Sequence, residues 1–187
     1  MKSRFTARDI TLTAVFTAIM VVAAMLFRYT GPIVPISLQP FVVMLAGGII
    51  GARLGSLSMV VYLLIGLVGV PVFAKAPFGG PAYVLMPTFG FLLGFAFSAY
   101  IIGFILERSE TRSLARYIVA MMTGILVYDI VGVAYLYLMM VFYMGGSYSM
   151  MDILAIGFFP FLALDLLKGL AAAFLAMAVS KRLQGNV

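Results

Sequence analysis

The stretch FFPFLALDLLKGLAAAFLAMAV, residues Phe158–Val179, is long and apolar enough to cross a bilayer, yet it contains Asp165 and Lys168. A charged side chain near the centre of a membrane helix costs about 2.5–3.5 kcal/mol on insertion scales. Because the two charges are three residues apart, they share one face of a helix. Ionisable residues inside membrane segments usually serve function. The stretch therefore predicts a transmembrane helix with a polar site inside it.

The composition extends this prediction to the whole chain. Of the 187 residues, 65% are hydrophobic and only 10% are charged, and the mean hydropathy is +1.19. A soluble domain is about half apolar and a quarter charged. The apolar runs are long and unbroken, unlike the short alternating strands of a membrane barrel. We expect an all-α polytopic membrane protein with residues 1–187 in a single integral membrane domain.

The apolar runs predict six transmembrane helices. Their expected ranges are 10–27, 38–52, 54–72, 89–106, 117–144 and 159–180. Pro32 and Pro35 interrupt the chain after the first span, and AKAPFGGPAYVLMPTFG (74–90) forms a long loop after the third, because proline and glycine break helices. The turn between the second and third spans is short.

The basic residues predict the orientation of these spans. With the N-terminus in the cytoplasm, the inner side holds Lys2, Arg4, Arg8, Arg53, Arg108, Arg112, Arg116, Lys181 and Arg182. The outer side holds only Arg28 and Lys75. This bias follows the positive-inside rule and predicts a multi-pass cell-membrane protein with both termini cytoplasmic. The net charge of +6 then reflects topology, and we expect no nucleic-acid partner.

Several classes of chemistry are excluded by the residues that are missing. The chain has no cysteine and no histidine, which removes disulfides, thiolate chemistry and the common His/Cys metal sites. The sequence has no GxxxxGK[ST] phosphate-binding loop, so the chain cannot hydrolyse ATP itself. A membrane-embedded enzyme would need a nucleophile next to a base, and no such pair is evident. We expect no catalytic activity, no metal and no cofactor.

The long loops of the predicted outer side lie above the charged pair, which indicates a pocket open to the outside. Two readings of the pair remain open. Asp165 and Lys168 either neutralise each other to fix helix packing, or bind a ligand with a carboxylate and a head that donates hydrogen bonds. Asp129 also lies within a span, so a coupled secondary transporter is a further alternative.

Other residues could complete such a pocket. Gln39 opens the second span at the outer surface, as an interfacial amide or as a ligand contact. Tyr128 and Tyr135 are seven residues apart, so they share a helix face and could form an aromatic wall. In the first span, AVFTA places Ala14 and Ala18 four residues apart. Small residues at this spacing let another helix approach closely, either inside the protein or from a partner.

Four blocks of the sequence carry a resemblance to a known family. They are AVFTA (14–18), VPISLQPFVVMLAGGIIGARLGSLSMVVYLLIGLVGVPVFA (34–74), MPTFGFLLGF (86–95) and FFPFLALDLLKGLAAAFLA (158–176). In order and spacing they resemble BioY-type proteins, the substrate-binding S components of energy-coupling factor (ECF) biotin transporters. The resemblance covers nearly the whole chain.

The resemblance implies a six-helix S component that captures biotin at the outer face. It implies partnership with a transmembrane coupling protein and two cytoplasmic ATPases, and an interface with the coupling protein at Ala14 and Ala18. It also implies that Asp165 and Lys168 contact biotin. Further substrate contacts are expected at Phe78, Gly79, Tyr83 and Thr88, in or beside an outer loop near 75–87 that would act as a lid.

Two alternatives to this function are kept open. The ligand could be a related vitamin or a biotin precursor. The chain could also work alone as a proton-driven vitamin transporter.

Overall fold

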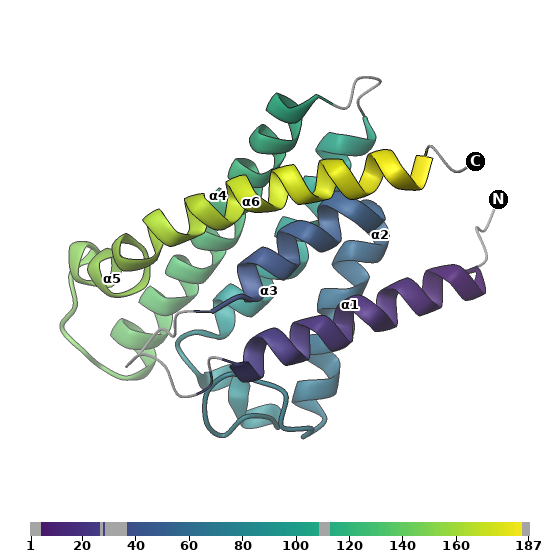
Figure 1. The fold of residues 1–187 in the computed structure, drawn as a ribbon. Coiled ribbons are helices and arrows are strands. Elements are labelled where there is room, and N and C mark those ends of the chain that lie inside the picture. Colours follow the sequence, from purple (N-terminus) through teal and green to yellow (C-terminus); the bar gives the residue numbers. More distant parts are fainter. Residues whose placement is uncertain (1–4, 27, 29–36, 109–112, 185–187) are drawn as a thin grey trace.

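The computed structural model describes residues 5–26, 28, 37–108 and 113–184 (Figure 1). The proline-interrupted loop expected after the first span lies almost entirely outside the described residues, as do Lys2, Arg4 and Arg112 of the predicted inner side. Within the described residues every regular element is helical, which confirms the all-α prediction.

The helices are α1 (Ala7–Leu26), α2 (Gln39–Leu67), η1 (Pro81–Leu85), α3 (Phe89–Glu107), α4 (Leu114–Tyr137), η2 (Leu138–Tyr143), α5 (Met150–Gly157) and α6 (Phe159–Gln184). The segment η1 is a 3₁₀ helix, and η2 is a π-helical continuation of α4. Among the described residues, five helical elements are long and apolar enough to cross a membrane: α1, α2, α3, α4 with η2, and α6.

The second of these elements, α2, is folded back on itself. The side-chain amide of Gln39 donates a hydrogen bond of 3.1 Å to the hydroxyl of Tyr62. In a straight helix, residues 23 positions apart would be separated by about 35 Å along the axis. The non-helical residue inside α2 is Gly51, with φ 84° and ψ 179°. The element is therefore a helical hairpin, with arms over residues 39–50 and 52–67.

This hairpin reconciles five membrane-span elements with the six predicted spans. The two arms, over residues 39–50 and 52–67, overlap the spans expected at 38–52 and 54–72. The second arm ends at Leu67, earlier than expected. Beyond it, Gly69 has φ 116° and the chain leaves the helix.

The turn at Gly51 is stabilised by a carboxylate from another helix. Glu107, the last residue of α3, accepts a hydrogen bond of 2.8 Å from the backbone N–H of Ala52. This N–H is among the first of the second arm, where backbone donors have no partner inside the helix. The backbone angles of Gly51 fall in a region that only glycine occupies readily. A Cβ on Gly51 would also collide with the Glu107 carboxylate.

The short helix α5 lies between the spans expected at 117–144 and 159–180 and has no counterpart among the predicted helices. Its start is a capping box: the Ser149 hydroxyl accepts from the Asp152 N–H at 3.2 Å, and the Asp152 carboxylate accepts from the Ser149 N–H at 2.8 Å. Ser-x-x-Asp before an apolar run is a recognised signal for a helix start.

The helices surround a common core in which α2 is central. It packs against α1, α3 and α6, while α4 packs against α3 and α6. The start of α1 and the end of α6 lie toward the same end of the bundle in Figure 1. The start of α6 and the short helix α5 lie at the opposite end.

Close packing of α3 against α4 positions the side chain of Tyr128. A Cβ on Gly94 of α3 would be only 2.8 Å from the Cα of Tyr128 on α4. The absence of a side chain at Gly94 therefore lets the helices meet at Tyr128. The ring of Tyr128 packs edge-on against Phe95, with 5.5 Å between centroids.

Replacement of Gly51 tests the hairpin turn. Gly51→Ala should lower the free energy of unfolding in detergent by about 1–3 kcal/mol for the strained backbone, with an added penalty from the collision with Glu107. Gly69→Ala is the matched control, because Gly69 also has positive φ but a Cβ there meets nothing within 4 Å. Thermal unfolding should show the larger loss for Gly51→Ala. Equal losses would contradict the role given to Glu107.

Candidate functional site

A cavity lies between the start of α2, the start of α6 and the helices α3 and α4. Its walls come from the start of α2, from α3, α4 and α6, and from the segment between α2 and η1. The described residues that line it are Ser37, Gln39, Pro40, Ala74, Lys75, Tyr83, Thr88, Phe91, Leu92, Phe95, Tyr128, Asp129, Gly157, Phe161, Asp165 and Lys168.

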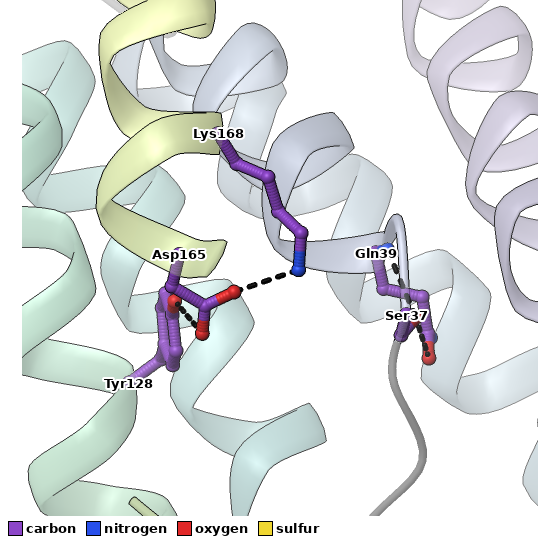
Figure 2. A network of polar contacts seen from close by, with 5 residues as sticks. All are labelled: Ser37, Gln39, Tyr128, Asp165 and Lys168. Atoms are coloured by element: carbon purple, nitrogen blue, oxygen red, sulfur yellow. Dashed lines mark hydrogen bonds and ion pairs between the residues drawn. The ribbon is translucent and has the colours of Figure 1, made fainter. Parts of the chain in front are cut away.

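The polar centre of the cavity is the pair predicted from the sequence. The Lys168 ammonium lies 2.7 Å from one carboxylate oxygen of Asp165, and the Tyr128 hydroxyl donates to the other oxygen at 2.8 Å (Figure 2). Asp165 is only 5% exposed. Each of its oxygens therefore has one donor, as a buried charge requires.

The position of the pair along α6 explains how charges can lie inside an apolar helix. The helix begins at Phe159, so Asp165 and Lys168 lie within its first three turns. Their i, i+3 spacing brings both side chains to the face that lines the cavity. The Lys168 side chain remains 15% exposed, and Figure 2 shows it reaching toward the start of α2. An ammonium with one carboxylate partner keeps further N–H donors for a ligand.

At the opposite wall, Gln39 is held by two partners. Its side-chain carbonyl accepts a hydrogen bond of 3.1 Å from Ser37, and its amide donates to Tyr62. Tyr62 in turn donates to the carbonyl of Val72 at 3.3 Å. These bonds connect the first arm of α2, its second arm and the segment that follows, so the cavity wall is fixed by the hairpin.

The segment between α2 and η1 is packed rather than extended into solvent. The Arg28 guanidinium donates to the carbonyls of Pro71 and Phe73 at 2.6 and 3.2 Å and stacks over the ring of Phe78. The Phe73 ring lies 4.1 Å from the ring of Tyr83. Burial raises the pKa of the Tyr83 hydroxyl. The segment forms one side of the cavity, and its expected movement as a lid stays a prediction.

The expected substrate contacts divide into two groups by position. Six lie in the cavity wall: Gln39, Tyr83, Thr88, Tyr128, Asp165 and Lys168. Phe78, Gly79 and Tyr135 are not among its described lining residues. Phe78 lies beneath Arg28, Gly79 packs against the backbone of Val70, and the Tyr135 hydroxyl donates to the carbonyl of Val84. These three residues support the outer segment.

The cavity also contains residues that the sequence analysis did not place there. The apolar and aromatic part of the wall is formed by Pro40, Ala74, Phe91, Leu92, Phe95 and Phe161. Asp129 is a second carboxylate in the wall and is 7% exposed. Phe91 and Phe95 look like ordinary membrane residues in the sequence. Asp129 stands out in the sequence as a charged residue within a predicted span, but only the structure shows that it lines the cavity.

Ala14 and Ala18 are not among the described residues that line this cavity. Both are exposed on α1, whereas the buried face of α1 packs on α2, with the Thr17 hydroxyl donating to the Ser58 carbonyl at 3.0 Å. Their small side chains therefore form a flat strip on the outer surface of α1. The strip is not used for packing among the described residues.

The fold and the cavity define a multi-pass α-helical membrane protein with a small-molecule site buried near one end. Comparison with known proteins then identifies the family. The model of the BioY family matches residues 1–185. The chain belongs to the BioY family.

Relatives and a solved structure agree with this assignment. The "Probable biotin transporter BioY" of Lysinibacillus sphaericus is 37% identical over 92% of this chain and 87% of its own length. The "Biotin transporter BioY" of Thermotoga maritima is 36% identical over 93% of this chain and 96% of its own. A crystal structure of the S component for biotin from an ECF-type ABC transporter superposes with a TM-score of 0.73, at 24% identity and 95% coverage of both chains. This last likeness confirms the S-component fold.

Removal of one partner of the ion pair tests its contribution to stability. Lys168→Met leaves the buried Asp165 carboxylate without its ammonium, and should lower the free energy of unfolding by about 3 kcal/mol. The double variant Asp165→Asn/Lys168→Met removes both charges and should recover most of that loss. Thermal unfolding in detergent without ligand measures both. A Lys168→Met variant as stable as wild type would show that the pair does not contribute to the fold.

Proposed function

We propose that this chain is the high-affinity biotin-binding S component of an ECF transporter, and that it takes up biotin across the cell membrane. Its membership of the BioY family and the printed names of its relatives as biotin transporters support the substrate. The single observation in the molecule that carries the proposal is the Lys168–Asp165–Tyr128 network in the wall of a cavity.

The chemistry of the cavity suits biotin. Biotin has a valerate carboxylate at one end and an uncharged cyclic urea with two N–H donors at the other, joined by an apolar ring and chain. The Lys168 ammonium and the carboxylates supply complementary partners. The aromatic wall around Phe91, Phe95 and Phe161 supplies apolar surface for the parts between. Ligand pockets usually combine a mainly apolar lining with a few fixed polar groups.

The orientation of the chain is part of the proposal. Most of the described basic residues lie at the helix ends or beside the hairpin turn, on the side of the bundle that holds the termini; they are Arg8, Arg53, Arg108, Arg116, Lys181 and Arg182. By the positive-inside rule this end faces the cytoplasm. The cavity at the opposite end then opens toward the outside, where biotin is captured.

The energy for uptake comes from other subunits in this proposal. The chain itself is a binding and transport subunit rather than an enzyme. A transmembrane coupling protein and two cytoplasmic ATPases would form the energising module. The exposed strip of Ala14 and Ala18 on α1 is the proposed contact with the coupling protein, because small residues allow close helix approach within a membrane.

Calorimetry with purified protein tests the binding function. Wild type should bind biotin, and Lys168→Ala should bind it at least tenfold more weakly, since a hydrogen bond to a charged group contributes about 1.5–3 kcal/mol. Lys75→Ala is a comparison variant at the rim of the same cavity and should have a smaller effect. Equal affinity of wild type and Lys168→Ala would remove Lys168 from the binding site.

Uptake in cells distinguishes the ECF transporter from the two alternatives. Labelled biotin should accumulate when the chain is produced with an ECF module, and should not accumulate in a host that lacks any ECF ATPase. Uptake without ATPases that stops on addition of an uncoupler would instead show a solitary proton-driven transporter. Binding of a different vitamin in preference to biotin would show the other alternative.

A further inference from the structure

Asp129 is the most unusual polar residue of the cavity. It lies on α4 next to Tyr128, is 7% exposed and lines the same cavity as Asp165 and Lys168. Among the residues that the structure describes, no hydrogen-bond donor contacts its side chain, whereas Asp165 receives one donor on each oxygen. Buried carboxylates are normally paired or hydrogen-bonded. The empty site therefore contains an acceptor without a donor.

A second negative charge in the cavity raises the free-energy cost of burying an ionised Asp129 carboxylate. The Asp165 carboxylate, which has the same sign, lines the same cavity and repels an ionised Asp129. The Lys168 ammonium is bonded to Asp165 at 2.7 Å. A like charge nearby and removal from water both disfavour an unsolvated carboxylate. A hydrogen-bond donor that enters the cavity can pair with Asp129, whereas an anionic group is repelled by the ionised carboxylate.

We propose that Asp129 is a specificity residue of the site, which accepts hydrogen bonds from N–H donors on the uncharged head of the ligand. This inference rests on the proposed biotin-binding function and adds a residue to it. Asp165 already accepts one hydrogen bond on each oxygen, from Lys168 and from Tyr128. Asp129 offers a cyclic urea a further acceptor, which has no donor among the residues that the structure describes.

The arrangement divides recognition between two walls of the cavity. Lys168 on α6 attracts an anion or an oxygen acceptor, while Asp129 on α4 accepts from N–H groups. A site built to hydrogen-bond a ligand N–H strongly rejects analogues that lack it, because the buried protein group is then left unpaired. The site should therefore discriminate cyclic ureas from isosteres in which ring oxygens replace the two N–H groups.

Two variants and two ligands test the proposal. The variants are Asp129→Asn and, as control, Asp152→Asn, which removes the same charge from an exposed carboxylate at the start of α5, outside the cavity. The hydroxyl and the backbone N–H of Ser149 hold the pKa of Asp152 below its usual range, so the control carboxylate is ionised at neutral pH. The ligands are biotin and its cyclic-carbonate analogue, measured by calorimetry or by competition against labelled biotin at pH 7.

The expected result is specific to a ligand contact. Asp129→Asn should bind biotin at least tenfold more weakly than wild type, and should bind the carbonate analogue within threefold of wild type. Asp152→Asn should match wild type with both ligands. The empty Asp129→Asn protein should unfold at the same temperature as wild type or higher, since the carboxyl group that the amide replaces has no donor among the described residues. A residue needed only for folding would lower that temperature.

Other outcomes would overturn the inference. Binding of biotin by Asp129→Asn within threefold of wild type would show that Asp129 does not contact the ligand. An equal loss for both ligands would show that its effect does not pass through the N–H groups. Failure of wild type itself to bind biotin would instead contradict the proposed function, so the two failures are distinguishable.

Discussion

The bond between the Lys168 ammonium and the Asp165 carboxylate, with Tyr128 on the second oxygen, is the interaction on which the site depends. Neither charge could remain alone in an apolar helix without a large desolvation penalty. Paired at 2.7 Å, they can line a cavity near the end of the bundle. The pair also links α6 to α4, so the polar centre of the site is part of the helix packing.

The rest of the cavity depends on the backbone of α2. Its reversal at Gly51 brings Gln39 against Tyr62, and this contact fixes the wall opposite Lys168. The reversal lies at the end of the bundle that holds the termini, with Glu107 capping the second arm. A constraint at one end of the molecule therefore shapes the binding cavity at the other.

Much of the fold could be predicted because lipid exposure forces long apolar helices, and because the charged pair marks one of them. The hairpin was interpreted as two spans with a short turn, which is close to what the structure shows. The predicted helices do not include α5, although Ser149 and Asp152 form a Ser-x-x-Asp pattern that marks a helix start.

The site was predicted in part. Asp165 and Lys168 stand out in the sequence as charged residues within an apolar run, whereas the direction in which Asp129 points depends on the rotation of α4. Phe78 was placed in the site through its loop, yet its ring is held beneath Arg28. Sequence spacing does not determine which way a loop side chain turns.

The most direct test of this account is an experimental structure of the chain with biotin bound. The account requires biotin inside the cavity between α4 and α6, with a polar ligand atom within hydrogen-bond distance of the Lys168 ammonium. Biotin bound elsewhere on the protein, or bound in the cavity with Lys168 contacting only Asp165, would contradict it.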